Sequence, residues 1–190
     1  MTVSIFDLFK IGIGPSSSHT VGPMKAACAF ARRLQDNGML DRVEGIHIRL
    51  HGSLAHTGKG HATDRAVLLG LEGELPATVD PATMDARLAN IHNEQTLRLL
   101  GQKPVSFNQQ EHLVFDRRKR LPHHSNGMNF TALSGDGSEL DSRDYYSVGG
   151  GFVLDQDEVA ADRVIEHSQP VRYPFDTCLL YTSDAADDFA

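Results

Sequence analysis

The sequence predicts a globular fold that contains both helices and strands, and three stretches carry that prediction. Apolar residues recur at helical spacing over residues 23–36. Residues 43–50 alternate between apolar and polar side chains, which is typical of a half-buried strand. Residues 129–133 and the stretch that begins at Tyr145 read as two strands of a hairpin, joined by a Gly/Asp/Ser turn.

The composition indicates a folded chain without a polyanionic partner. The 190 residues are 40% hydrophobic and 23% charged, enough to bury one good core. The formal net charge is −7 and the one basic cluster lies at 117–120, so we expect neither nucleic acid nor an anionic membrane as partner. The chain has no apolar stretch of about 20 residues and no signal-peptide pattern, so we expect a cytoplasmic protein.

The helix over residues 23–36 has both of its ends marked. Pro23 suits the first helical position, and Asn37-Gly38 supplies a stop. Cys28 lies on the apolar stripe, so we expect a buried thiol without a reactive role. The chain has one other cysteine, Cys178, and two cysteines indicate neither a disulfide framework nor a ligand cluster.

The strand over residues 43–50 leads into a glycine-rich stretch. Alternation directs Ile46, Ile48 and Leu50 to one face, and it places His47 and, more loosely, His51 on the polar face. Residues 52–64 then read as a loop that ends at a helix, which Gly73 stops.

This second loop carries His56, Lys59 and His61, which we expect to face one crevice. The spacing of its glycines does not match a phosphate-binding loop, because Gly60 stands where the magnesium-binding hydroxyl is needed.

The remaining elements are less strongly marked. We predict a helix over residues 81–100 with His92 on the surface, and strands over 104–107 and 112–115. Gly149-Gly150-Gly151 interrupts the last apolar strand, which indicates either a bulge or a close approach by a ligand or another domain.

The two ends of the chain also carry expectations. Residues 4–9 form an amphipathic lead-in, and residues 155–167 are weakly helical. Residues 170–175 read as extended. Residues 176–190 continue no pattern of the preceding chain and are similar to translated sequencing-adapter read-through, so they are left out of the fold.

The stretch 10–23 is the strongest candidate for a ligand site. Glycines and Pro15 bracket compact hydroxyl donors and one imidazole, and a helix follows whose N-terminus favours anions. The donors are Ser16, Ser17, Ser18 and Thr20, and the imidazole is His19. The pattern favours a cradle for a small anion, and the alternative is an ordinary Gly/Pro/Ser turn.

A third unusual loop lies at 121–128. His123 and His124 precede an Asn-Gly turn at Asn126, and adjacent histidines could bind a metal. Neighbours on extended backbone point apart, however, so at most one of them needs to face the site.

Four motifs in this order resemble the N-terminal, β-type domain of bacterial iron–sulfur L-serine dehydratases, also called L-serine ammonia-lyases. The motifs are GPSSSHTVGPM at 14–24, GSLA with TGKGHxTD over 52–64, HxNGM at 124–128 and YYSVGGGF at 145–152. The resemblance runs from about Ser4 to Phe175, and the domain that it predicts covers residues 1–175. It implies an α+β domain, a mixed sheet with flanking helices, similar to the substrate-binding regulatory domain of some phosphoglycerate dehydrogenases.

The resemblance also implies a reaction and its parts. L-serine would be converted to pyruvate and ammonia without pyridoxal phosphate, with the open iron of a [4Fe–4S] cluster as Lewis acid toward the β-hydroxyl. A larger α domain or subunit would carry the cluster thiolates, and the complete enzyme would be a homo-oligomer. This chain lacks that domain, and Cys28 alone cannot hold a cluster, so we expect no metal ligands here and no activity from the chain alone.

In that reaction we expect His61 to be the base, because a neutral imidazole can accept a proton near neutral pH. His19 and His124 would orient the substrate or assist proton transfer. The groups expected to hold the substrate are Ser16, Ser17, Ser18, Thr20, Lys59 and Asn126. The alternative is a non-catalytic domain that binds a small carboxylate, for which three convergent imidazoles are not needed.

Overall fold

The computed structural model of the chain describes residues 12–161. The expected lead-in at 4–9, the extended stretch at 170–175, the tail at 176–190 and Cys178 lie outside the described residues. The helices are α2 (Gly22–Asp36), α3 (Gly52–Thr57), α4 (Thr63–Leu71), α5 (Pro81–Glu94), α6 (Gln109–His112) and α7 (Gln156–Ala160). Three further helical turns are η1 (Ser17–Val21), η2 (Leu40–Arg42) and η3 (Gly58–His61).

Seven strands form one mixed sheet. They are β1 (Gly45–His51), β2 (Thr96–Leu99), β3 (Lys103–Ser106), β4 (Leu113–Asp116), β5 (Gly127–Leu133), β6 (Glu139–Gly149) and β7 (Phe152–Asp155). The order is β2-β3-β1-β5-β6-β7, and β4 also pairs with β1. β1 runs parallel to β3 and β4 and antiparallel to β5, so the α+β class with a mixed sheet is confirmed.

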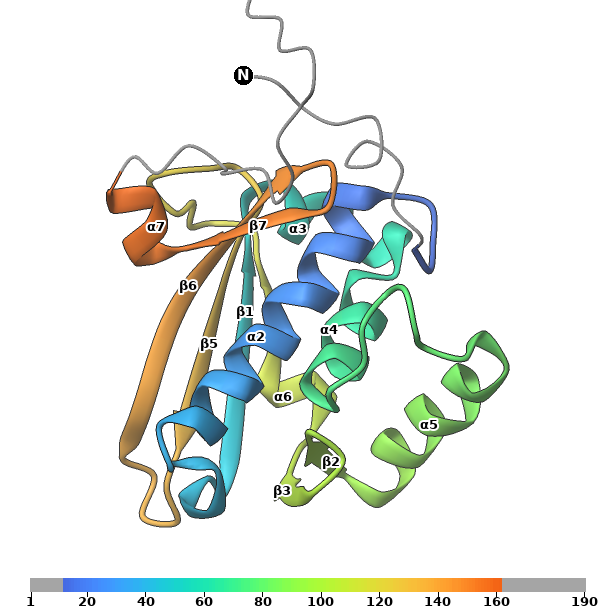
Figure 1. The fold of residues 1–190 in the computed structure, drawn as a ribbon, viewed down its shortest axis with the longest axis vertical. Coiled ribbons are helices and arrows are strands. Elements are labelled where there is room, and N and C mark those ends of the chain that lie inside the picture. Colours follow the sequence, from blue (N-terminus) through green and yellow to red (C-terminus); the bar gives the residue numbers. More distant parts are fainter. Residues whose placement is uncertain (1–11, 162–190) are drawn as a thin grey trace, which may run out of the picture.

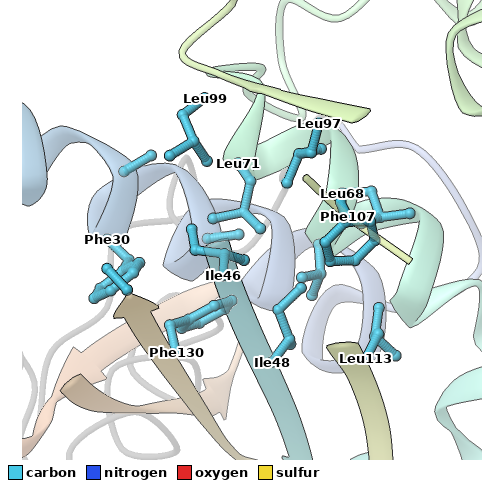
Figure 2. Packing of buried hydrophobic residues seen from close by; sticks show 14 of the residues in the cluster. Phe30, Ile46, Ile48, Leu68, Leu71, Leu97, Leu99, Phe107, Leu113 and Phe130 are labelled. Carbon is cyan, nitrogen blue, oxygen red and sulfur yellow. The ribbon is translucent and has the colours of Figure 1, made fainter. Parts of the chain in front are cut away.

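Helices α2 and α4 lie side by side against one face of the sheet, and α5 lies beyond α4 (Figure 1). The core fills the space between these layers (Figure 2). Ile46 and Ile48 of β1 and Phe130 of β5 meet Phe30 of α2 and Leu68 of α4, all of them at most 1% exposed. Burial of such side chains contributes about 1.5–3 kcal/mol each.

The two best-marked elements are where the sequence predicts them. Helix α2 contains Pro23 in its first turn and ends at a cap on Asn37. Cys28 is 1% exposed on its inner face, as expected. Strand β1 buries its apolar positions and leaves Arg49 exposed, so the predicted alternation is confirmed.

The helix predicted over residues 81–100 is wrong in its last turn. Helix α5 ends at Glu94, and Gln95 adopts a left-handed conformation with φ of 48°. The chain then reverses into β2, which pairs with β3. Leu99 is fully buried as expected, but it packs from the sheet and not from a helix.

The glycine-rich loop expected over residues 52–64 is wrong as well, because these residues form α3, η3 and the start of α4. His51 lies on the predicted face of β1, but the expectation that this face is solvent-exposed there is wrong. Its side chain is 2% exposed, and its Nδ1 lies 3.8 Å from a carboxylate oxygen of Asp116. His47, by contrast, is half-buried, and its ring lies 5.0 Å from the ring of His112.

The glycine run forms the turn between β6 and β7. Gly149, Gly150 and Gly151 all have positive φ, and the strand pairing shifts register between Ser147 and Gly149. The Nζ of Lys25 donates to the carbonyl of Gly151 at 2.9 Å. The register shift agrees with the bulge alternative, and the turn is tied to α2, while a close approach by a ligand or another domain stays a prediction.

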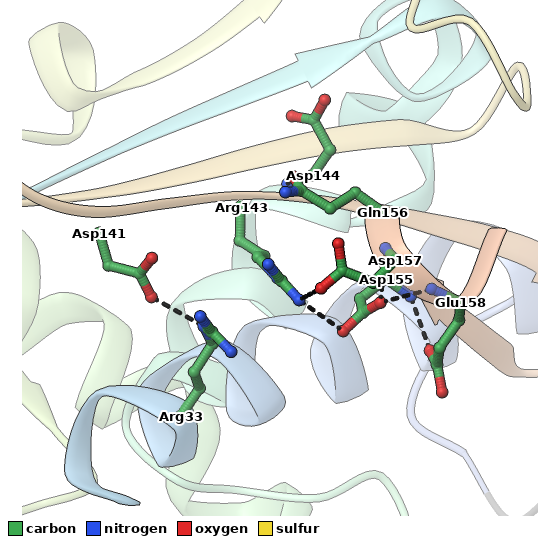
Figure 3. Close-up of polar contacts among 8 residues, drawn as sticks. All are labelled: Arg33, Asp141, Arg143, Asp144, Asp155, Gln156, Asp157 and Glu158. Atoms are coloured by element: carbon green, nitrogen blue, oxygen red, sulfur yellow. Dashed lines mark hydrogen bonds and ion pairs between the residues drawn. The ribbon is translucent and has the colours of Figure 1, made fainter. Parts of the chain in front are cut away.

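Ion pairs fasten the last described elements to β6, and β6 to α2 (Figure 3). Arg33 of α2 pairs with Asp141 of β6 at 2.8 Å, and Arg143 pairs with Asp155 at 3.3 Å and with Asp157. Asp155 caps α7 in a capping box with Glu158. No helix in residues 12–161 is long and apolar enough to cross a membrane.

Candidate active site

The hydroxyl-rich stretch is a helical turn and not a loop in front of a helix. η1 is a π-helical turn that runs directly into α2, a rare geometry that is frequent at functional sites. Ser16 caps it, because its Oγ accepts a hydrogen bond from the backbone N of His19 at 3.2 Å. Gly22 joins the two helical segments, and an added Cβ there would lie 2.0 Å from Oγ of Ser147.

The ring of His19 is held at both nitrogens by hydroxyl groups. Its Nδ1 lies 2.9 Å from Oγ of Ser18, and its Nε2 lies 3.1 Å from Oγ of Ser53 at the start of α3. A hydroxyl can donate or accept, so both neutral forms of the imidazole are compatible with these partners. Figure 1 places α3 at the same end of the molecule as the start of α2.

The ring of His61 has one nitrogen committed. Its Nδ1 lies 2.9 Å from the carbonyl oxygen of Thr57, which can only accept, so Nδ1 carries the proton. In the neutral ring Nε2 then has a free lone pair. The ring centroids of His61 and His19 are 4.9 Å apart, so the structure brings these two predicted residues together.

Two threonines bind the main chain beside these rings. Thr20 is 1% exposed, and its hydroxyl donates to the carbonyl of His61 at 2.9 Å. The hydroxyl of Thr63 donates to the carbonyl of His19. Each histidine segment is therefore held by a threonine of the other segment.

The environment of His19 favours its neutral form. Burial chiefly, and then the adjacent His61 ring, lower the pKa of His19 below its ordinary value of 6.5, while a hydrogen bond to the main chain of Ser53 acts in the opposite direction. The lowered pKa favours the uncharged ring of His19 at neutral pH.

His124 is held in the opposite form to His61. The backbone N–H of Asn126 donates to Nδ1 of His124 at 3.0 Å, so in the neutral ring the proton is on Nε2. Asn126 is buried, and its side-chain amide donates to the carbonyl of Ser147 at 3.1 Å. Among the described residues, the ring of His124 contacts neither His19 nor His61.

A main-chain contact places the His124 segment near the paired histidines. The N–H of Ser53 donates to the carbonyl of Ser125 at 2.8 Å. Gly52 makes that approach possible, because its φ is +56° and an added Cβ would lie 2.2 Å from the Ser125 oxygen.

The other predicted residues are more loosely placed. Ser17 is exposed, and its hydroxyl has no hydrogen bond within residues 12–161, so this hydroxyl is available to a ligand. Lys59 is exposed on η3, and His56 is exposed near the end of α3. The structure brings neither of them into contact with the paired rings.

Sequence reasoning missed Ser53, Thr57 and Thr63 as site residues. The first two lie four residues apart on α3, and together they hold both imidazoles. A helix reading of residues 52–57 would have placed them on one face, but the glycines at 52 and 58 favoured a loop.

The described residues do not fit an iron–sulfur cluster or another metal centre. Cys28 points into the core, where burial raises the pKa of its thiol and its Sγ donates to the carbonyl of Gly73 at 3.6 Å. Within residues 12–161 no three or more His, Cys, Asp or Glu side chains are grouped to hold a metal ion.

Comparison with known proteins agrees with the motifs. Residues 4–158 match the family described as the serine dehydratase beta chain. The chain is 51% identical over 177 residues to an L-serine dehydratase of Streptomyces coelicolor, covering 93% of this chain and 39% of that protein. It is 44% identical to L-serine dehydratase 1 of Escherichia coli over 91% of this chain and 37% of that protein.

An L-serine dehydratase of Haemophilus influenzae is 41% identical over 91% of this chain and 38% of its own length. The chain therefore spans less than two fifths of the length of these relatives. The matched region contains the hydroxyl turn, residues 16–20, and the paired histidines His19 and His61. The chain therefore belongs to the serine dehydratase beta chain family.

Proposed function

We propose that this chain is the β part of an L-serine dehydratase, which converts L-serine to pyruvate and ammonia. The observation that carries the proposal is the His61 ring, whose Nδ1 donates to Thr57 while Nε2 keeps a lone pair beside His19. Removal of the α-proton of serine needs such a base near neutral pH. A domain that only binds a carboxylate has no use for it.

In this proposal Nε2 of His61 accepts the α-proton. The resulting imidazolium is stabilised at Nδ1 by the Thr57 carbonyl, which holds the ring in one orientation throughout. His19 stays neutral next to that positive charge, because burial and the proximity of His61 lower its pKa. The pair therefore contains one base and one neutral hydrogen-bonding ring.

The carboxylate of serine would be held by the hydroxyl turn. Ser17 offers an exposed hydroxyl at the start of a continuous helix, where the dipole favours a negative charge. His124 can donate from Nε2–H, because its Nδ1 is occupied by the N–H of Asn126. Thr20 and the amide of Asn126 are engaged with the main chain, so we assign them positioning roles.

We propose that the thiolates of any [4Fe–4S] cluster come from an α domain or subunit outside this chain. Such a cluster would supply a Lewis acid for the departing β-hydroxyl, while the residues of this chain hold the carboxylate and accept the α-proton. Lys59, which is exposed, would meet either the substrate or that partner.

The test is a chimera in which residues 4–158 replace the matching part of the Streptomyces coelicolor relative. We expect His61→Ala to lower kcat and kcat/KM together by about 10²–10⁴, and His19→Ala mainly to raise KM. Near-normal kcat in His61→Ala would make His124 the next candidate for the base. If all three histidines were dispensable, the domain would be a carboxylate-binding module.

A further inference from the structure

We propose that Ser53 is a positioning residue for His19, which holds that ring in one orientation and completes the hydrogen bonds of either neutral form. The proposal rests on the proposed function insofar as His19 acts on the substrate. The contact itself is independent of the reaction, since Oγ of Ser53 lies 3.1 Å from Nε2 of His19.

Every polar group of Ser53 is engaged. Its N–H donates to the carbonyl of Ser125 at 2.8 Å, and its carbonyl accepts from the hydroxyl of Thr57 at 2.9 Å. Ser53 therefore connects the three segments that carry His19, His61 and His124. Because both its N–H and its carbonyl are hydrogen-bonded, the backbone of Ser53 is fixed, and its one hydroxyl can orient the ring of His19.

The hydroxyl of Ser53 is not needed to build α3. The residue that caps this helix, His51, makes no side-chain capping bond, and the close approach to Ser125 is made possible by Gly52. The one hydrogen bond of the Ser53 hydroxyl within the described residues is the bond to His19. The hydroxyl of Ser53 therefore serves to position the ring of His19 and not to stabilise α3.

The hydroxyls of Ser16 and Ser18 lie on the Nδ1 side of the His19 ring, and they leave the hydrogen bond at Nε2 to Ser53. Oγ of Ser18 lies 2.9 Å from Nδ1 of His19 and 3.3 Å from Oγ of Ser16. If Ser18 donates to Ser16, it must accept from Nδ1–H, and Ser53 must donate to Nε2. If Ser18 donates to Nδ1, then Nε2–H must donate to Ser53. Without the Ser53 hydroxyl, Nε2 of His19 loses this hydrogen bond in both arrangements.

Nuclear magnetic resonance of the ¹⁵N-labelled chain tests the contact without any catalysis. Ring ¹⁵N shifts report which imidazole nitrogen is protonated, and a His19→Gln spectrum assigns the His19 signals. We expect Ser53→Ala to change the ring shifts of His19 and lower its pKa, because the charged ring loses an acceptor. The shifts of His61 should stay in place, and Ser53→Thr should restore those of His19. Unchanged His19 shifts in Ser53→Ala would overturn the proposal.

Kinetics of the chimera test the consequence. Ser53→Ala should raise KM by about 2- to 12-fold, the effect of one net hydrogen bond, and should add nothing in a His19→Ala background. Ser106→Ala, at an exposed position of β3, is the matched control and should leave KM unchanged. Equal effects of Ser53→Ala in both backgrounds would overturn the proposal. If His19→Ala itself left KM and kcat unchanged, the proposed role of His19 in the reaction would be wrong. The ¹⁵N ring shifts would still decide whether Ser53 positions His19.

Discussion

The hydroxyl of Thr20 donates a hydrogen bond to the main-chain carbonyl of His61 at 2.9 Å. The relation is reciprocal, because Thr63, two residues after His61, donates to the carbonyl of His19. The 4.9 Å separation of the two imidazole rings is thus set from the backbone, and the ring atoms remain available to a substrate. Both threonines are at most 1% exposed, so water does not compete for these bonds.

Thr20→Val should reduce the free energy of unfolding by about 1–3 kcal/mol, because the variant keeps the shape but leaves the His61 carbonyl without its partner. Chemical denaturation of the isolated chain measures this. Thr20→Ser keeps the hydroxyl and is the control, with a smaller loss from the missing methyl group. Equal destabilisation in both variants would show that the methyl group and not the hydrogen bond matters.

The sequence predicts the elements whose signals are local. Pro23 and the apolar spacing determine α2, and the alternation of Ile46, Ile48 and Leu50 determines β1, because both patterns follow from backbone period and burial. The end of α5, by contrast, is not determined by a local sequence signal. Gln95 takes a left-handed conformation although neither glycine nor asparagine marks the position, and the pairing of β2 with β3 stabilises the reversal.

For the candidate site, the sequence indicates which residue types lie there but not which of them contact one another. Ser16, Ser18 and Thr20 look alike in sequence, yet one caps η1, one binds a ring and one binds the main chain of another segment. Alternation likewise gives the face on which His51 lies, but not that Asp116 and other residues cover that face. Such contacts depend on which segments meet in space.

Gly22→Ala should destabilise the chain by about 1–3 kcal/mol through overpacking. The added Cβ would lie 2.0 Å from Oγ and 2.8 Å from Cβ of Ser147, on a packed strand. Denaturation of Gly22→Ala measures the loss. Gly60→Ala, whose Cβ would meet no atom within 4 Å, is the control and should lose much less.

Ser147→Ala distinguishes the two clashes of an added Cβ at Gly22, because it removes Oγ of Ser147 and leaves Cβ. The hydroxyl of Ser147 is buried without a hydrogen-bond partner in the described chain, so its removal alone should be neutral or stabilising. In combination with Gly22→Ala it should recover part of the lost stability. Strict additivity of the two changes would contradict the close approach of α2 and β6.

Acid should destabilise the chain partly through His51. Burial lowers the pKa of His51 below 6.5, and the charge of Lys119 acts in the same direction, while the charges of Asp116 and Asp144 and a hydrogen bond to the main chain of Lys119 act to raise it. As the pH falls through about 6.5, the unfolded chain binds a proton at this position and the folded chain does not, so stability is lost until the pH reaches the lower folded pKa.

His51→Gln, which has no charge to gain, should therefore lose less stability between pH 7 and the acid range than the unchanged chain, measured as unfolding midpoints at each pH. His92→Gln, at an exposed position of α5, is the control and should keep the original pH dependence. An unaltered pH dependence in His51→Gln would show that other groups carry the acid sensitivity.

The hydroxyl turn should separate into residues that hold the fold and one that holds the ligand. Ser16→Ala removes the cap of η1 and should cost about 0.5–2 kcal/mol of stability. Ser17→Ala removes an exposed hydroxyl, so stability should be unchanged. If Ser17 binds the carboxylate, the affinity for L-serine should fall by about 10- to 150-fold, the value of one charge-assisted hydrogen bond.

Titration calorimetry of L-serine with the chain or the chimera measures the affinity, and denaturation of the same variants measures the stability. Ala29→Ser, on the exposed side of α2, is the control for a hydroxyl outside the turn. If Ser17→Ala kept full affinity while Ser16→Ala only destabilised, the turn would be a helix start without a ligand role. A loss of affinity in Ser17→Ala at unchanged stability would instead place the carboxylate at the N-terminus of the continuous η1–α2 helix, where the dipole and the free hydroxyl act on the same charge.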